Sequence, residues 1–336
     1  MSTTTVDTYP VALAVASYLG YNGYKKGSLS QTGAITAALV GYANLANPYI
    51  GHGLTLICFY LTGSRATKYK ANIKAQLEAH SSPTSAIKVD TDDNKKKDVS
   101  SGNRSAIQVL CNSATATLAC IVFRKLNSGF NVAAIDPLGK EMLKLIQLGR
   151  VKIGLNNLLL TLIVGGHYAA CLGDTLASEL GILSKSQPRL ITNPFRVVPK
   201  GTNGGVSTWG LFVSAIGGAL IGVVQSVCIA YHYYGSNQSS GKDVQVYAQL
   251  TALLTAAGLV GSLIDSVLGA TLQQTLVNKL TKRVLVNQFT DAKPTDFSNG
   301  QWTNVSGYNL LSNNGVNFVA SAITALGTAW FGLQLF

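Results

Sequence analysis

The stretch Ser207–His232 reads STWGLFVSAIGGALIGVVQSVCIAYH and contains no Asp, Glu, Lys or Arg. A helix needs roughly 20 predominantly apolar residues to cross a hydrocarbon core about 30 Å thick. This segment therefore predicts a membrane-spanning helix, and the rest of the chain is interpreted with the bilayer as its solvent.

The composition of the whole chain agrees with this interpretation. Charged residues make up 12% of the 336 residues, about half of the roughly 25% that is usual in soluble proteins. Hydrophobic residues reach 47% and the mean hydropathy is +0.26, which excludes a disordered chain because disorder requires low hydrophobicity. The sequence predicts an all-α, multi-pass protein with a single integral membrane domain over residues 1–336.

Working outward from this segment, we expect about eight spans. The Asn47-Pro48 break makes the second and third a tight helical hairpin. The eight candidate segments are Tyr9–Tyr24, Thr32–Ala46, Pro48–Thr62, Ser105–Phe123, Ile153–Leu172, Ser207–His232, Val246–Leu272 and Gly315–Leu335.

The intervals between the spans differ in character. Residues 65–104 are polar and predict a solvated cytosolic loop, and residues 279–311 are polar without helical periodicity. Residues 124–152 combine charge with periodic apolar positions, which is typical of an amphipathic helix at the membrane interface. Residues 182–206 are basic and rich in glycine.

The net charge of +12 would suit nucleic acid, but in a membrane protein bases gather in cytoplasmic loops, so we expect no nucleic-acid partner. An N-terminus outside places 19 of the 26 bases in inner segments, although six bases in 124–152 oppose this orientation. The sequon at Asn237 then lies outside, and those at Asn103 and Asn304 inside. The N-terminal residues lack the features of a cleaved signal or transit peptide, so we expect the endoplasmic reticulum or another intracellular membrane.

Three acids lie in or beside apolar spans: Asp174, Glu179 and Asp265. A carboxylate near the bilayer centre costs about 3 kcal/mol and persists where it faces a polar cavity, pairs with a cation or binds metal. Asp265 shares a helical stripe with Gly261 and Gly269, which predicts close approach of another helix. Asp174 and Glu179 could share one Mg²⁺ only if their helix bends, near Gly173 or Gly181. The alternative is that each acid pairs with a base or caps a helix.

A basic, glycine-rich segment follows these acids. Glycines allow backbone N–H groups to approach an anion, and lysine and arginine neutralise phosphate charge. An ordinary turn is the alternative, because the segment matches neither a Walker A loop nor a Rossmann fingerprint. The residues concerned are Lys185, Arg189, Arg196, Lys200, Gly201, Thr202, Asn203, Gly204 and Gly205.

Two polar stripes are expected to line the same cavity. Gln108 and Asn112 lie one turn apart in the fourth span, and Asn313, Asn314 and Asn317 begin the last. Amides in membrane helices also serve simply as hydrogen bonds between helices. The four histidines are too scattered for a metal site, and the five cysteines, all in apolar segments, are read as packing residues.

Several motifs resemble the transmembrane protein nineteen family, a multi-pass family long described as a domain of unknown function. They run in the family's order from about residue 25 to the C-terminus, whereas the segments around 79–102 and 124–152 look peculiar to this chain. The matching blocks are Ser64–Lys70, Gln108–Asn112, Gly173–Glu179, Ser184–Thr192, Pro199–Val206, Gly261–Thr271 and Asn313–Asn317.

Plant chloroplast members of that family are phytyl-phosphate kinases, and the block 173–206 distantly resembles dolichol and phytol kinases that use CTP. The resemblance implies a Mg²⁺-dependent kinase that converts an isoprenyl monophosphate into its diphosphate with CTP or ATP at the cytosolic membrane face. Lys68 then joins the phosphate-binding residues and Ser178 the cavity lining. The lack of a transit peptide puts phytyl phosphate itself in question.

The kinase hypothesis assigns the metal to Asp174, Glu179 and Asp265. The main alternative is a transporter or carrier of an anionic or lipid solute, in which the same carboxylates couple to protons or Na⁺. A structural scaffold is a third interpretation, but it leaves the buried acids unexplained. Prenyl chain length, nucleotide and oligomeric state stay open.

Overall fold

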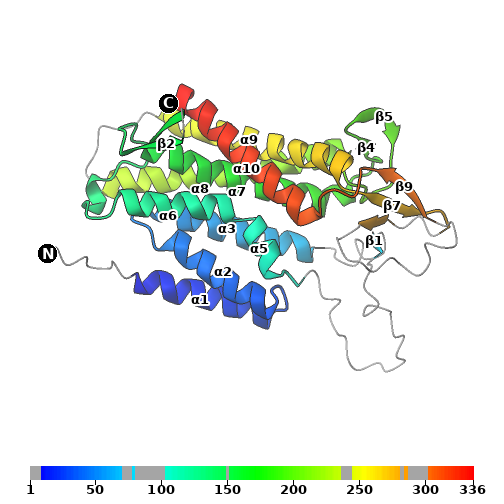
Figure 1. The fold of residues 1–336 in the computed structure, drawn as a ribbon, viewed down its shortest axis with the longest axis horizontal. Coiled ribbons are helices and arrows are strands. Elements are labelled where there is room, and N and C mark those ends of the chain that lie inside the picture. The colour runs from blue at the N-terminus through cyan, green and yellow to red at the C-terminus, as the bar shows by residue number, and fades with distance from the viewer. Residues whose placement is uncertain are drawn as a thin grey trace.

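The computed structural model describes residues 9–69, 78–79, 103–148, 151–235, 244–280, 284–286 and 302–336. Helices that run roughly along one long axis dominate this part of the chain (Figure 1). They are α1 (Pro10–Lys25), α2 (Gln31–Leu45), α3 (Ile50–Lys68), α5 (Ala106–Cys111), α6 (Ala114–Leu126), α7 (Asn157–Leu180), α8 (Thr208–Gly235), α9 (Val244–Leu272) and α10 (Asn313–Leu335).

Local sequence signals set where several helices begin. The side chains of Ser30, Asn156 and Ser312 accept hydrogen bonds from backbone N–H groups three residues later, at 2.9, 2.8 and 3.3 Å. Such caps satisfy donors that have no partner within the helix. Pro10 opens α1, at a position where a missing N–H costs nothing.

Four helical segments of the described chain are long and apolar enough to cross a membrane: Asn157–Leu183, α8, α9 and α10. The first joins α7 to a short 3-10 helix, Gly181–Leu183. Helices α1 and α2 have only 16 and 15 residues, fewer than the roughly 20 that a span requires. The expected count of eight spans is therefore not confirmed.

Two of the expected spans have different boundaries in the structure. The predicted span Ser105–Phe123 is broken at Asn112 and Ser113 into α5 and α6. The predicted span Ile153–Leu172 begins as a β-strand, and its helix starts only at Asn157.

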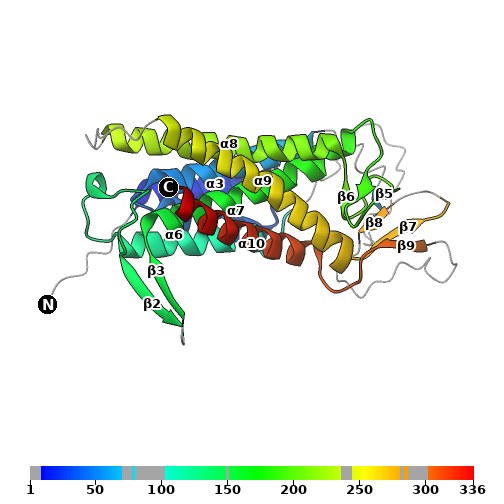
Figure 2. The same cartoon turned by 90° about the horizontal axis from the view of Figure 1, so that it is seen from above.

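Helix α7 is the central element of the bundle, in contact with α3, α6, α8, α9 and α10. Figures 1 and 2 show it running between these neighbours. Leu158, Leu162 and Leu172 of α7 are buried in one core cluster with Tyr49 and Phe123. Groups presented by α7 therefore face protein rather than lipid over most of its length.

Short strands occupy regions for which no strand was expected. The amphipathic helix expected over residues 124–152 is wrong for residues 142–148 and 151–152, because β2 (Lys144–Leu148) and β3 (Val151–Leu155) pair as an antiparallel hairpin. Residues 124–126 end α6, and Val132–Ala134 form one 3-10 turn.

Two small sheets use the remaining connections. In the basic segment β4 (Arg189–Leu190) pairs with β5 (Asn193–Val197) and β6 (Gly205–Val206). A second sheet has the order β1-β8-β7-β9, formed by Glu78–Ala79, Val284–Val286, Thr275–Asn278 and Trp302–Ser306. Most of the expected loop 65–104 and the sequon at Asn237 lie outside the described residues.

The two ends of the bundle carry different connections (Figures 1 and 2). One end holds the two small sheets, and the other holds the hairpin β2–β3 and the C-terminus. Contacts tie the first end together: Leu29 bridges to Arg104, Arg104 Nη2 donates to Thr67 Oγ1 at 3.2 Å, and Asn203 N donates to Thr275 Oγ1 at 3.3 Å. The basic segment 182–206 thus shares one end with residues 26–30 and with the described residues 273–280 and 302–311, as the orientation expected from the sequence requires.

Candidate carboxylate site

Two acids from different helices face each other inside the bundle. Asp174 of α7 and Asp265 of α9 are both half-buried and lie close enough to interact electrostatically. Cys171, one turn before Asp174, lies within electrostatic range of both carboxylates and beside Ser321 of α10. The structure thus brings together two of the three acids singled out in the sequence.

An asparagine bridge joins this pair to a fourth chain segment. The side-chain amide of Asn317 in α10 lies 3.3 Å from Asp265 Oδ2 on one side and 3.3 Å from Asn112 Oδ1 on the other. With its nitrogen toward the carboxylate, the amide donates to Asp265 Oδ2 and to the backbone carbonyl of Asn313 at 2.9 Å. In the opposite orientation the same nitrogen donates to Asn112 Oδ1 at 3.3 Å instead. The two expected polar stripes therefore meet at the carboxylate pair.

Asn112 stands where the fourth predicted span is interrupted. Its side chain donates to the carbonyl of Gln108 at 2.9 Å, and its own carbonyl accepts from Cys171 Sγ at 3.7 Å. Non-helical backbone within the membrane is tolerated where protein groups or a water-filled cavity supply hydrogen-bond partners for its N–H and C=O groups. The polar pair Asn112-Ser113 within an apolar run was the signal that could have predicted this break.

Glycines beside Asp174 let three helices touch through their backbones. A methyl group on Gly173 of α7 would overlap the carbonyl oxygen of Gly258 in α9. One on Gly217 of α8 would lie 2.9 Å from Gly173 Cα, and one on Gly258 would lie 2.6 Å from Cα of Gly218. We call these four glycines the glycine crossing. It fixes the separation of α7 and α9, and hence of the two carboxylates.

Glu179 does not join the pair. Helix α7 continues without a break through Gly173, so the bend that would bring Glu179 onto the face of Asp174 does not occur. Within the described residues no three His, Cys, Asp or Glu side chains are grouped so that they could hold a metal ion. The expected set of three carboxylates is reduced to the Asp174–Asp265 pair.

Glu179 lies instead beside Arg104, which the sequence reasoning did not single out. Burial lowers the pKa of the Arg104 guanidinium, and the Glu179 carboxylate and Tyr60 raise it. Arg104 is held in place through its backbone, which bonds to Ser28 and Ser30 at 3.2 and 3.0 Å. This pairing joins segments far apart in the sequence, so no local pattern could reveal it.

The bases of the segment 182–206 have different environments. Lys200 Nζ donates to the carbonyls of Ile182 and Ser184 at 3.1 and 2.6 Å, which caps the end of the α7 segment. Arg189 Nη1 donates to the carbonyl of Pro194 at 2.9 Å and is otherwise exposed, as are Lys185 and Arg196. Lys200 is therefore a structural residue here, whereas the exposed bases remain accessible to an anion.

The turn Gly201–Gly205 is packed against the end of α9. A methyl on Gly204, whose φ is +76°, would overlap Ala270 and lie 2.7 Å from the carbonyl oxygen of Ser266. The N–H groups of Thr202, Asn203 and Gly205 donate to Pro199 O, Thr275 Oγ1 and Thr202 O. Three of the five N–H groups expected to bind phosphate thus have partners within the protein.

The remaining residues expected at the site flank the pair or lie at the surface. Asn313 and Asn314 are half-buried at the start of α10, and Gln108 is half-buried in α5. Lys68 is exposed at the end of α3, and Ser178 is exposed on α7.

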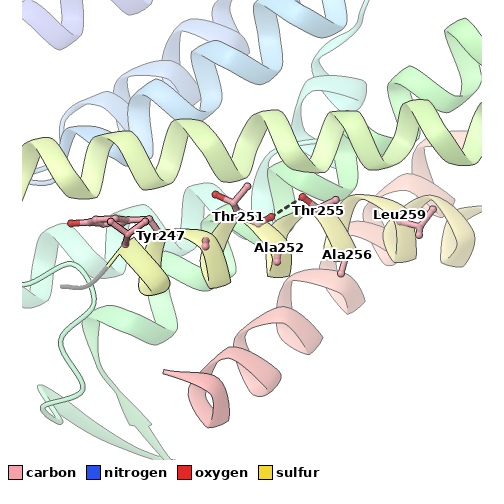
Figure 3. A pocket seen from close by; sticks show the side chains of 8 residues that line it. Tyr247, Thr251, Ala252, Thr255, Ala256 and Leu259 are labelled. Carbon is pink, nitrogen blue, oxygen red and sulfur yellow. Dashed lines mark hydrogen bonds between the residues drawn. The ribbon is translucent and has the colours of Figure 1, made fainter.

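An open recess of about 720 Å³ lies elsewhere, along the first half of α9 (Figure 3). Its lining includes Tyr247, Thr251, Thr255 and Leu259, and Thr255 Oγ1 donates back to the carbonyl of Thr251 at 2.7 Å. None of the residues expected at the site lines this recess. It is a groove on one helix face, not the carboxylate site.

The arrangement at the pair defines what it can do chemically. Two adjacent carboxylates are stabilised by a cation between them or by one shared proton. The amide of Asn317 lies within hydrogen-bonding distance of Asp265 and supplies a neutral donor to the pair. The site thus suits either a hard divalent cation or a proton.

Comparison with known proteins identifies one family and two similar proteins. The family described as integral membrane protein DUF92 matches residues 14–325. Protein PGR of Arabidopsis thaliana is 32% identical over 326 residues, which cover 97% of this chain and 96% of its own length. An uncharacterized membrane protein of Methanocaldococcus jannaschii is 51% identical over 55 residues, 16% of this chain and 23% of its own. No solved structure matches.

Proposed function

We propose that this chain, which belongs to the integral membrane protein family DUF92, is a kinase that uses CTP or ATP to convert an isoprenyl monophosphate into its diphosphate. The observation that carries the proposal is the Asp174–Asp265 pair, held between α7 and α9 and joined to Asn317. The motifs around Asp174 and Asp265 are also those that resemble lipid and isoprenyl kinases.

The donor set fits Mg²⁺. This ion usually takes one or two carboxylates, completes its coordination with water and substrate phosphate oxygens, and does not need a cage made of protein alone. Asp174 and Asp265 are the residues that would hold it. When bound, Mg²⁺ would neutralise charge on the phosphate oxygens of the nucleotide.

The exposed bases at the same end of the bundle supply the complementary charge. Lys185, Arg189 and Arg196 lie on the segment that follows α7, where they can neutralise a polyphosphate. In the reaction, an oxygen of the isoprenyl phosphate forms a bond to the terminal phosphorus of the nucleotide. The bond from that phosphorus to its bridging oxygen breaks, and the nucleoside diphosphate leaves with the electron pair. Phosphoryl transfer of this kind depends on positioning and charge neutralisation, so no protein nucleophile is needed.

We expect the prenyl chain of the substrate to stay in the bilayer. Its phosphate would then reach the Asp174–Asp265 pair from the membrane. Prediction: purified protein in liposomes transfers the terminal phosphate of labelled CTP or ATP to an isoprenyl monophosphate, and Asp174→Asn or Asp265→Asn abolishes the transfer. Each substitution keeps the shape of the side chain and removes its charge.

Glu141→Gln is the matched control, because it removes an exposed acid at the opposite end of the bundle and should leave transfer unchanged. Wild-type activity in both Asp variants would refute the assignment. A transporter is the second candidate, since one shared proton also suits the carboxylate pair. Flux of an anionic or lipid solute into sealed vesicles without nucleotide, with no transfer in the kinase assay, would favour it.

A further inference from the structure

The hairpin β2–β3 is anchored to the start of α7 and extends to one side of the helices. Leu143 N donates to the carbonyl of Leu155 at 2.8 Å, and Leu158 N donates to the carbonyl of Gly139 at 3.1 Å. Figure 2 shows the hairpin leaving the bundle sideways near the C-terminus, crossing the long axis of the helices steeply. Since that axis is the direction in which the spanning helices cross a membrane, the hairpin lies beside the bundle and not beyond its end.

Large apolar side chains on and beside the hairpin are exposed. Ile146 and Ile153 stand directly opposite each other and are 37% and 39% exposed. Leu145 and Met142 are 48% and 64% exposed. A lone two-stranded hairpin is marginally stable in water. The apolar side chains of this hairpin therefore need to be buried against something. No described residue of this chain covers them.

The two faces of the hairpin differ. Side chains alternate between faces along a strand, so Ile146 and Ile153 share one face, with Lys144 at its end. Gln147 and Lys152, also paired directly, lie on the other face with Leu145. The pairs Ile146–Ile153 and Gln147–Lys152 are neighbours along the hairpin. The first pair is apolar and the second is polar, and they point to opposite faces.

Charge around the hairpin indicates what the cover is. Lys140, Lys144 and Lys152 are exposed, and Glu141 is the one acid among residues 140–148 and 151–155. Lysines beside a membrane attract anionic headgroups, and their alkyl stems can lie along apolar surface.

Exposed aromatic residues mark the same level of the bundle. Tyr231 and Tyr234 at the end of α8 are 70% and 87% exposed, and Trp330 near the end of α10 is 68% exposed. His232 Nε2 lies 2.7 Å from the carbonyl of Ile135, which ties the end of α8 to the segment that leads into the hairpin. Tyrosine and tryptophan are enriched where a helix meets the headgroups.

We propose that the hairpin β2–β3 lies in the headgroup layer of the bilayer, with Ile146 and Ile153 toward the acyl chains and its lysines bound to anionic phospholipid. The outer strand edges pair with no other described strand, which is unfavourable in the hydrocarbon core, where every backbone group needs a hydrogen-bond partner, but is compatible with the hydrated headgroup layer. The inference does not depend on the proposed kinase activity.

The test compares the two faces in lipid nanodiscs with and without anionic phospholipid. In a variant whose native cysteines are replaced, Ile146→Cys and Gln147→Cys each carry an environment-sensitive fluorophore. We expect blue-shifted emission at position 146, with several-fold stronger quenching by spin labels on lipid chains than at position 147. Equal, water-like emission at both positions would overturn the proposal. Shielding at position 146 that depends on protein concentration and not on lipid would overturn it in favour of a second copy of the chain.

A second measurement keeps the native cysteines. Replacing Lys140, Lys144 and Lys152 together with glutamine should reduce the number of anionic lipids that stay bound during native mass spectrometry. The matched control replaces Lys185 with glutamine at the opposite end of the bundle and should leave the lipids bound to the hairpin unchanged. Equal lipid retention in the triple variant and the wild type would contradict the proposal.

Discussion

Individual side chains decide whether the carboxylate pair can act. Asn317 is the residue through which α10 reaches the pair, since its amide lies between Asp265 and Asn112. Sequence patterns predicted that Asn112, Asn317 and three acids share one cavity. The structure brings the two asparagines close to Asp174 and Asp265 but leaves Glu179 apart, beside Arg104. The position of Glu179 could not be predicted, because it depends on whether α7 bends.

Asn317→Leu should leave the fold intact and weaken the site. Removing a group that orients a metal-binding carboxylate typically lowers metal affinity or activity by about 10- to 100-fold. We therefore expect phosphate transfer to fall within that range and the Mg²⁺ concentration at half-maximal rate to rise. Gln334→Leu changes an exposed amide on the same helix and should alter neither quantity. Equal losses in both variants would indicate a general effect on α10.

The substitution Lys200→Met tests whether Lys200 stabilises the fold or binds phosphate. Because Lys200 donates to two backbone carbonyls, its loss should reduce the free energy of unfolding by about 1.5–3 kcal/mol, with or without nucleotide. Lys185→Met should instead leave the thermal midpoint unchanged and raise the KM for nucleotide. A raised KM with unchanged stability in Lys200→Met would show that Lys200 binds the substrate.

At the scale of helices and strands, the glycine crossing is the feature that sets the geometry of the site. Gly173→Ala places a methyl against the backbone of α9, which typically costs about 1–3 kcal/mol, and should also separate Asp174 from Asp265. We expect a lower thermal midpoint in detergent and reduced transfer.

Gly327→Ala is the control for this substitution. Gly327 lies in α10 with no atom within 4 Å of an added methyl, so alanine should leave activity unchanged and can add up to about 1 kcal/mol through helix propensity. Equal destabilisation by both alanines would mean that the crossing is not close-packed.

Sequence periodicity located two of the long helices closely, but it misplaced the ends of α7 and did not reveal the strands. The predicted span Val246–Leu272 corresponds to α9, and Gly315–Leu335 to α10, within two residues at each end. Residues 124–152 were interpreted as an amphipathic interfacial helix because Met142, Leu145, Ile146 and their apolar neighbours also fit helical spacing. These residues form strands because β2 and β3 pair with each other. The spacing of apolar residues within one segment does not reveal such pairing.

At the scale of the whole molecule, the connections sort into two ends, as the distribution of bases suggested. Cysteines introduced at Gln187 and Ser128, both exposed, should be labelled by an impermeant reagent from opposite sides of a sealed membrane. With the N-terminus outside, position 187 faces the cytosol. Labelling of both from one side would contradict the arrangement, and labelling of position 187 from the outside would reverse the orientation.

The glycine crossing also restricts how a fatty substrate travels. Where the main chains of α7, α8 and α9 touch, no hydrocarbon tail can slip between them. For the proposed kinase, we therefore expect a prenyl tail whose phosphate is bound near Asp265 to enter on the side of α5 and α10, where Asn112 and Asn317 lie. Under the proposed function, bulky residues introduced beside Asn112 or Asn317 should therefore discriminate between short and long prenyl tails.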